Sequence, residues 1–159
     1  MTSLNDRENF IASYGALFEH SPWVVQRASA MLPLPSLHAG LMKVVHDATP
    51  EEQLSLIRAH PELAGKAAVD GTLTDASAAE QASAGLDQLT QEEFDRFHAL
   101  NHAYAEKFGF PFILCVRLTN KAGILAAMES RLGNDRDTEI ATAIEQIGEI
   151  VRLRLEHVL

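Results

Sequence analysis

The stretch IATAIEQIGEIVRLRLEHV, residues 140–158, says most about how this chain folds. An α-helix turns by ~100° per residue, so side chains three or four positions apart share one face. The apolar residues with this spacing form one stripe: Ile140, Ile144, Ile147, Val151, Leu155 and Val158. The pattern predicts a long amphipathic helix from Asp137 to the C-terminus, with its apolar face packed against other elements.

Two arginines of this stretch point in different directions. Arg154 projects within ~40° of Ile140, so its side chain is directed inward. Arg152 projects roughly a third of a turn away, where Glu149 is available as an i, i+3 partner. A buried guanidinium needs an anion close by. Arg154 is therefore expected to bind either a protein carboxylate or a ligand, and helix geometry leaves both open.

The segments before this helix have the same periodicity. Their starts are marked by capping boxes at Thr49, Ser77 and Thr90 and by Ser21 in front of a proline. Gly109 is expected to end one helix as its C-terminal cap. The predicted helices span residues 8–18, 23–32, 36–47, 50–60, 77–88, 91–108 and 121–132.

The expected fold class is all-α, a single compact multi-helix domain over residues 1–159. FPFILCV, residues 110–116, is the one strand-like run, and without a second strand it is expected to be an extended buried segment. Residues 60–75 hold two glycines and a proline without a sustained period, which predicts a long loop. Loops of that length are often functional.

Composition excludes several classes of protein. A single cysteine, Cys115, excludes an intramolecular disulfide framework and a four-cysteine zinc site, and predicts an intracellular protein. A formal charge of -9 disfavours binding to nucleic acid. The N-terminus lacks a secretion signal and no window approaches 18 consecutive apolar residues, so a membrane protein is not expected.

The histidines are the first candidates for chemistry. His98 and His102 lie four residues apart on a predicted helix, but the pattern His-Glu-x-x-His is absent, so the pair is interpreted as a polar helix face. His60 lies at a helix end before Pro61 and opens the loop, where it either serves a site or caps the helix C-terminus. Glu80 has a structural interpretation as the glutamate of the Ser77 capping box.

Four segments together resemble one enzyme family. They are HPELAGKAA at 60–68, Ser77-x-x-Glu80-Gln81 followed by AGLDQL, FDRFHALNHAYAEKFGFPFILCVR at 94–117, and the final IVRLRLEHVL. In this order they are similar to the 2-oxo-4-hydroxy-4-carboxy-5-ureidoimidazoline (OHCU) decarboxylases of urate breakdown. Each motif alone is weak, and their joint occurrence is specific.

The resemblance implies an all-helical carboxy-lyase that forms (S)-allantoin and carbon dioxide from a small-molecule substrate, without cofactor or metal. It implies catalytic roles for His60, Glu80 and Arg154. The substrate-binding positions that it implies are Pro61, Ser77, Gln81, Phe110, Pro111, Phe112, Ile113 and Leu114. The chain ends His157-Val158-Leu159 rather than in the peroxisomal tripeptide of some eukaryotic members, which predicts a cytoplasmic protein. A homodimer stays open.

Two other interpretations compete with this one. In the first, the chain is a non-enzymatic helical interaction module, and His60, Glu80 and Arg154 are a cap, a capping box and a core ion pair. In the second, it is a different small-molecule lyase or hydrolase on the same scaffold. Thiol chemistry is the weakest alternative, because Cys115 lies in an apolar run without a second cysteine.

Overall fold

The computed structural model describes residues 4–65, 68 and 70–158. In this part of the chain all regular structure is helical, so the predicted all-α class is confirmed. The α-helices are α1 Leu4–Tyr14, α2 Trp23–Ser29, α3 Leu37–Asp47, α4 Pro50–Arg58, α6 Asp75–Ser83, α7 Gln91–Phe108, α8 Lys121–Arg131 and α9 Arg136–Val158. A short 3-10 helix, η1, covers Val116–Leu118. None of the described helices is long and apolar enough to cross a bilayer.

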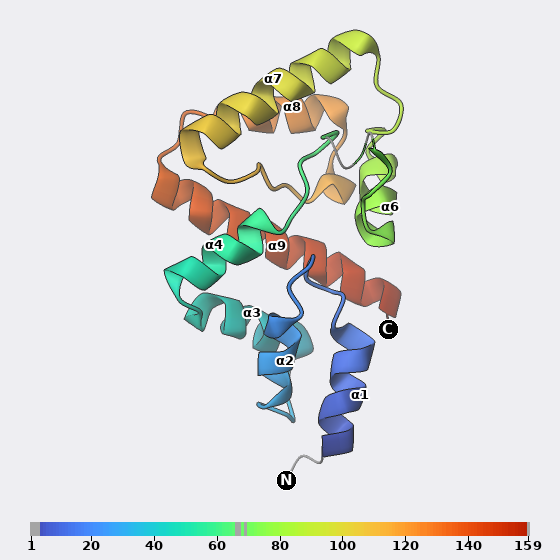
Figure 1. Ribbon diagram of the computed structural model, residues 1–159, viewed down its shortest axis with the longest axis vertical. Helices are drawn as coiled ribbons and strands as arrows, with labels where there is room; N and C mark the ends of the chain where they lie inside the picture. Colours follow the sequence, from blue (N-terminus) through green and yellow to red (C-terminus); the bar gives the residue numbers. More distant parts are fainter. Residues whose placement is uncertain (1–3, 66–67, 69, 159) are drawn as a thin grey trace.

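Helix α9 is the central element of the fold. Figure 1 shows it crossing the middle of the molecule, with α1 to α4 on one side and α6, α7 and α8 on the other. Its predicted stripe is buried at Ile144, Ile147, Val151 and Leu155, and Ile140 packs against the same core. One helix thus contributes side chains to both halves, and Arg154 lies on its buried face.

Capping explains why several helices begin where they do. The hydroxyl of Thr49 accepts the backbone N–H of Glu52 at 3.1 Å, and the carboxylate of Glu52 accepts the N–H of Thr49 at 3.0 Å. Thr90 and Glu93 form the same reciprocal pair at the start of α7. Gly109 ends α7 in the left-handed region, with φ of 79°. These predicted caps are confirmed. They were predictable because they depend only on interactions between residues close in the sequence.

The predictions for three helices, at 8–18, 23–32 and 77–88, were wrong in part. Helix α1 ends at Tyr14 instead of residue 18, because the chain turns there to bury Leu17 and Phe18. Helix α2 ends at Ser29, and its N-terminal cap position is occupied by Pro22 without a side-chain cap, so Ser21 does not cap it.

The third correction concerns α6 and bears directly on the site. The cap is Thr74, whose hydroxyl accepts the N–H of Ser77 at 3.2 Å, so the helix begins at Asp75. Ser77 is therefore inside the first turn and does not head a capping box with Glu80. Neither side chain caps the helix. Ser77 instead donates to Glu19, and Glu80 accepts from Arg154. The predicted loop over 60–75 also needs correction, since Ala68 and Asp70 are helical.

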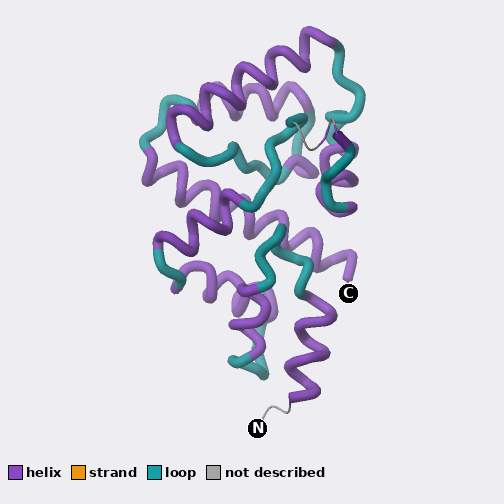
Figure 2. Tube along the Cα trace, in the orientation of Figure 1, coloured by secondary structure: helices purple, strands orange, loops and turns teal. Residues whose placement is uncertain are grey.

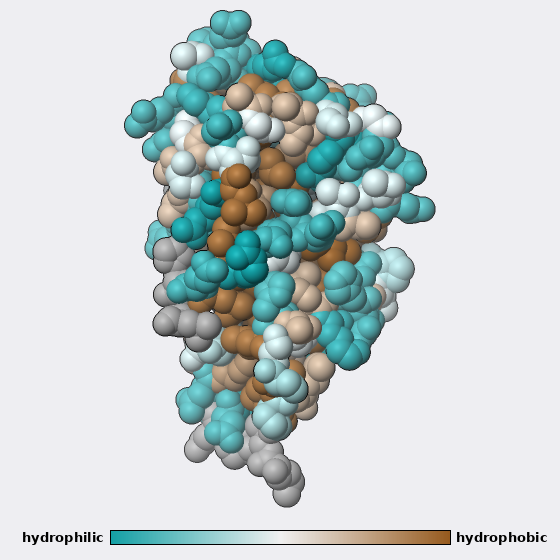
Figure 3. All heavy atoms as spheres, turned by 180° about the vertical axis from the view of Figure 1, so that it is seen from behind, coloured by the Kyte–Doolittle hydropathy of each residue, from teal (hydrophilic) through white to brown (hydrophobic). Residues whose placement is uncertain are grey.

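The segment between α7 and η1 has neither helix nor strand at residues 111–115, and Figure 2 shows it as a loop running back from the end of α7. Phe112, Ile113 and Cys115 are buried. A buried ion pair between Arg131 and Glu139 holds this segment in place, because Arg131 Nη1 donates to the carbonyl oxygen of Ile113 at 2.7 Å. On the face opposite to that of Figure 1, apolar surface is broken up by hydrophilic side chains (Figure 3).

Candidate active site

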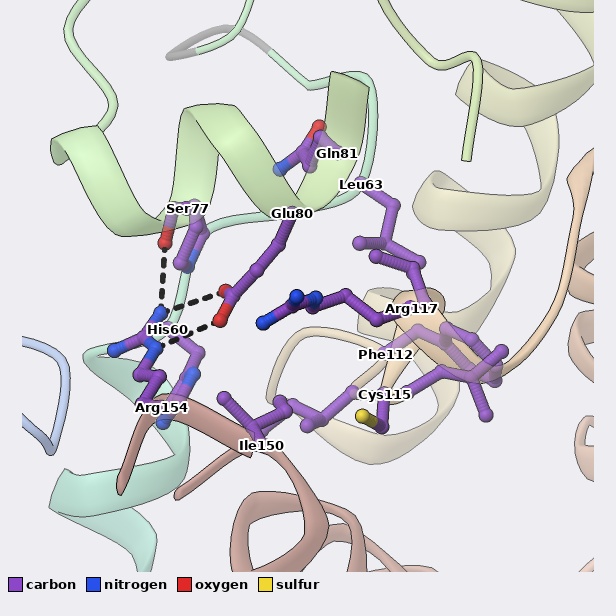
Figure 4. A pocket seen from close by; sticks show the side chains of 14 residues that line it. His60, Leu63, Ser77, Glu80, Gln81, Phe112, Cys115, Arg117, Ile150 and Arg154 are labelled. Carbon is purple, nitrogen blue, oxygen red and sulfur yellow. Dashed lines mark hydrogen bonds and ion pairs between the residues drawn. The ribbon is translucent and has the colours of Figure 1, made fainter. Parts of the chain in front are cut away.

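A narrow pocket of about 30 Å³ lies where four separate parts of the chain meet. The end of α4 and the following turn supply one wall, α6 the second, residues 112–117 the third and α9 the fourth. Figure 4 shows side chains from all four converging. The pocket is lined by His60, Pro61, Leu63, Ser77, Glu80, Gln81, Phe112, Ile113, Leu114, Cys115, Val116, Arg117, Ile150 and Arg154.

Arg154 organises the polar half of the pocket. Its Nε and Nη2 atoms donate to the two carboxylate oxygens of Glu80, each at 2.8 Å, in a two-pronged ion pair. Nη1 donates to the carbonyl oxygen of Leu17 at 3.1 Å, and Nη2 also donates to the hydroxyl of Ser77 at 3.3 Å. Burial alone would lower the pKa of Arg154, but the hydrogen bond and charge of Glu80 and the charge of Glu19 raise it. Protein carboxylates thus supply the anion that this buried guanidinium requires.

Glu19 is a buried site residue that sequence reasoning missed. Its carboxylate accepts hydrogen bonds from the hydroxyls of Thr74, at 2.7 Å, and Ser77, and one oxygen lies 3.7 Å from Arg154 Nη1. Burial would raise the pKa of Glu19, but these hydrogen bonds and the charge of Arg154 hold it below its usual value. Glu19 lies in a turn with no periodicity, so no sequence signal distinguished it from a surface acid.

His60 is a buried residue in the lining of the pocket. Its side chain is 7% exposed, and Nε2 has no hydrogen-bond partner among the described residues. Burial, with the nearby positive charge of Arg154, lowers the pKa of His60 to about 4, although the charge of Glu19 opposes the shift. The imidazole is therefore neutral at pH 7. A buried neutral ring with an unsatisfied nitrogen is well placed to exchange a proton with a ligand.

Gln81 fixes the turn that carries the HPELAG motif. Its Oε1 accepts the N–H of Ala64 at 2.9 Å, and its Nε2 donates to the carbonyl of Glu62 at 3.3 Å. Asn101 adds a bond from Nδ2 to the carbonyl of Leu63 at 2.9 Å. The turn is held from two helices, which sets the position of the pocket wall behind His60.

Residues 112–117 line one wall of the pocket. The N–H of Cys115 is bound by Gln146 Oε1 at 2.9 Å, whereas no hydrogen bond is formed by the N–H groups of Phe112, Ile113 and Leu114 within the described part of the chain. Phe110 and Pro111 do not line the pocket. Burial, together with the negative charge of Glu80, raises the pKa of the Cys115 thiol, which disfavours thiolate chemistry there.

The remaining sequence candidates lie elsewhere. Arg152 forms the predicted ion pair with Glu149, at 2.7 Å, on the partly exposed side of α9. His102 is exposed beside Glu106 on α7. Among residues 4–65, 68 and 70–158, no three His, Cys, Asp or Glu side chains are grouped in a way that could hold a metal ion.

Comparison with known proteins identifies the family. A family model described as OHCU decarboxylase matches residues 3–156. The chain is 42% identical over 153 residues to the 2-oxo-4-hydroxy-4-carboxy-5-ureidoimidazoline decarboxylase of Haloferax volcanii, covering 94% of this chain and 89% of that protein. It is 40% identical to the protein of the same name from Halalkalicoccus jeotgali, over 95% of this chain and 85% of that one.

A solved structure agrees with these sequence relatives. A crystal structure of (S)-allantoin synthase superposes with a TM-score of 0.77 at 28% identity, over 96% of this chain and 50% of that one. Its similarity therefore extends over nearly the whole fold described above. The sequence match over residues 3–156 and the relatives at 40% identity or more show that this chain belongs to the OHCU decarboxylase family.

Proposed function

We propose that this protein converts 2-oxo-4-hydroxy-4-carboxy-5-ureidoimidazoline to (S)-allantoin and carbon dioxide, without a cofactor. The substrate carries a carboxylate and a hydroxyl on a ring carbon beside a C=N bond. When carbon dioxide leaves, its bonding electrons form a carbon–carbon double bond and the imine nitrogen takes up the displaced pair. The hydroxyl then becomes the ring carbonyl as the carbon bearing the ureido group gains a proton. The imine is the electron sink that other decarboxylases obtain from a cofactor.

His60 is the proposed proton-transfer group. It is neutral at pH 7, and its Nε2 has no partner among the described residues, so a substrate hydroxyl could donate to it. The imidazolium formed in this way could return a proton to the carbon that carries the ureido group. The buried position keeps bulk water away from that step.

Glu80 and Arg154 are the proposed orienting pair. The guanidinium holds both oxygens of Glu80, so the carboxylate is fixed in direction. Glu80 can then accept hydrogen bonds from the ureido or hydroxyl donors of the substrate through its remaining lone pairs. The N–H groups of Phe112 to Leu114, which form no hydrogen bond with any described residue, could supply donors for the ring carbonyl. Ser77, Gln81 and Pro61 complete the binding wall.

The observation that carries the proposal is the meeting of His60, Glu80 and Arg154 in one buried pocket of a family member. These residues are far apart in the sequence, and the Glu80 side chain is released from any capping role. We also propose that the protein is a homodimer and lies in the cytoplasm, which analytical ultracentrifugation and cell fractionation test.

The activity test uses the unstable intermediate itself. Urate oxidase and hydroxyisourate hydrolase generate it from urate, this protein is added, and (S)-allantoin is followed by circular dichroism. We expect (S)-allantoin to form much faster than in the spontaneous reaction, and its dichroic signal to have the sign of a single enantiomer. An unchanged decay of the intermediate would instead support a helical interaction module, with the Arg154–Glu80 pair as a core ion pair.

A further inference from the structure

The polar cluster of the pocket carries more negative than positive charge. Glu19 and Glu80 place two carboxylates against the single guanidinium of Arg154. All three side chains are largely buried, with 3%, 13% and 7% of their surface exposed. His60 adds no charge at pH 7, because its imidazole is neutral. Without a further cation, a substrate that carries a carboxylate would therefore meet a cluster with an excess of buried negative charge.

Arg154 has no pair of N–H groups left with which to bind the carboxylate of a substrate. Its Nε, Nη1 and Nη2 atoms already donate to Glu80, to the carbonyl of Leu17 and to Ser77, and Nη1 also faces Glu19. A substrate carboxylate could reach this guanidinium in two-pronged geometry only by displacing Glu80. Such a displacement would leave a buried carboxylate without its partner, which is costly.

Arg117 is the other cation in the lining of the pocket. It lies on η1, is exposed to solvent, and forms no side-chain hydrogen bond or ion pair with any described residue. In Figure 4 its guanidinium points toward the carboxylate of Glu80. Arg117 also lines a second hollow of about 590 Å³ between α1 and α6, which shares Glu80 and Arg154 with the pocket. Arg117 therefore borders both the pocket and the hollow.

We propose that Arg117 is a substrate-positioning residue that binds the carboxylate of an anionic ring compound and gives the site its preference for anions. The inference rests on the proposed function in one respect, which is that the carboxylate bound is the one that later leaves as carbon dioxide. The negative charge of that carboxylate disappears during the reaction, so Arg117 stabilises the bound substrate more than the transition state. Its removal should raise KM without lowering kcat.

The kinetic test compares two variants that lose the same charge. In Arg117→Gln we expect KM to rise about tenfold, kcat to change less than threefold, and the fall of kcat/KM with added salt to become shallower. Arg96→Gln is the control, because Arg96 forms an exposed ion pair with Glu129 away from the pocket. It should retain wild-type constants and salt dependence. Arg117→Lys should recover part of the lost substrate affinity, since it restores charge without the planar fork.

A binding test separates this inference from the proposed function. Calorimetry measures two neutral ligands, hydantoin and (S)-allantoin, and one anionic ligand, hydantoin-5-acetate, on wild type and Arg117→Gln. We expect the variant to lose about tenfold in affinity for hydantoin-5-acetate and to bind the neutral ligands as wild type does. Wild type that binds hydantoin-5-acetate through Arg117 but has no decarboxylase activity would refute the function and support this residue assignment.

The opposite outcomes overturn the inference. An active wild type whose Arg117→Gln variant has unchanged KM, salt dependence and affinity for hydantoin-5-acetate would leave the function intact and remove Arg117 from the site. Absence of hydantoin-5-acetate binding to wild type also counts against it. An equal loss for the neutral and anionic ligands would show that Arg117 shapes the pocket rather than selects charge. Far-ultraviolet dichroism of each variant checks that the fold is kept.

Discussion

At the scale of single residues, the two neighbouring arginines of α9 have separate consequences. Arg154 is buried and holds Glu80 by two bonds, whereas Arg152 pairs with Glu149 at a partly exposed position. Lysine keeps the charge of Arg154 but cannot reproduce the planar fork, so Arg154→Lys should lower kcat/KM at least tenfold and destabilise the fold by about 1–3 kcal/mol. Arg152→Lys should be nearly silent, since exposed pairs contribute little.

The measurement is a thermal melt beside the dichroism assay on both variants. Lysine variants with equal activities would contradict the assignment of Arg154 to the site. An inactive but stable Arg152→Lys would show that the other arginine is the functional one.

A substitution at Glu80 distinguishes a catalytic role of this residue from a structural one. Thr74 caps α6, so Glu80→Gln leaves the helix start intact. The variant loses the charge that faces Arg154 while keeping a side chain of similar size. We expect the catalytic efficiency to fall by roughly 10²-fold or more, with a stability loss of about 1–3 kcal/mol, because Glu19 still lies beside Arg154. Glu51→Gln, at an exposed position of α4, is the control. Wild-type turnover in Glu80→Gln would make Glu80 a structural residue only.

At the scale of helices, two threonine caps offer a matched comparison. Thr74 and Thr90 both cap a helix by accepting the N–H three residues on, but only Thr74 also donates to the buried carboxylate of Glu19. Thr90→Ala should cost about 1 kcal/mol of stability, and Thr74→Ala should cost more because it also removes the hydrogen bond to Glu19. Thr74→Ala should also lower kcat/KM several-fold, because α6 carries Ser77, Glu80 and Gln81 into the pocket. Thr90→Ala should leave kcat/KM unchanged. Equal effects of the two substitutions on activity would contradict the coupling of α6 to the site.

Helix boundaries were predictable where one local signal had no competitor. The capping boxes at Thr49 and Thr90 and the long period of α9 are of this kind. The start of α6 was not, because Ser77 has a capping-box glutamate at Glu80 but the helix is capped by Thr74. The choice depends on contacts between distant segments, namely Thr74 with Glu19 and Glu80 with Arg154. Glu19 could not be found in the sequence for the same reason, because its partners lie more than 50 residues away.

At the scale of the whole molecule, the buried site makes stability depend on pH. The pKa of His60 falls from 6.5 to about 4 on folding. Between these values the unfolded chain binds a proton that the folded protein does not, so stability is present above pH 6.5 and is lost as the pH falls toward 4. Glu19 acts in the same direction at lower pH, because its lowered pKa favours the folded state only while it is ionised.

Chemical denaturation at pH 7 and pH 5 measures this effect. The stability lost between the two values should be about 2 kcal/mol smaller in His60→Asn than in wild type. His102→Asn removes an exposed histidine and should keep the wild-type dependence. The same pH dependence in His60→Asn and wild type would contradict a buried, neutral His60 in the folded protein.

The central claim is that a buried neutral histidine in this pocket performs the decarboxylation without a metal, and one assay tests it most directly. Formation of (S)-allantoin is followed by circular dichroism with wild type before and after exhaustive chelation, and with His60→Asn at equal concentration. The account predicts an unchanged rate after chelation and a rate lower by roughly 10²- to 10⁴-fold in the folded variant, as expected for a positioned acid or base. A chelated enzyme that regains activity only with added metal, or a His60→Asn variant within a few-fold of wild type, would contradict it.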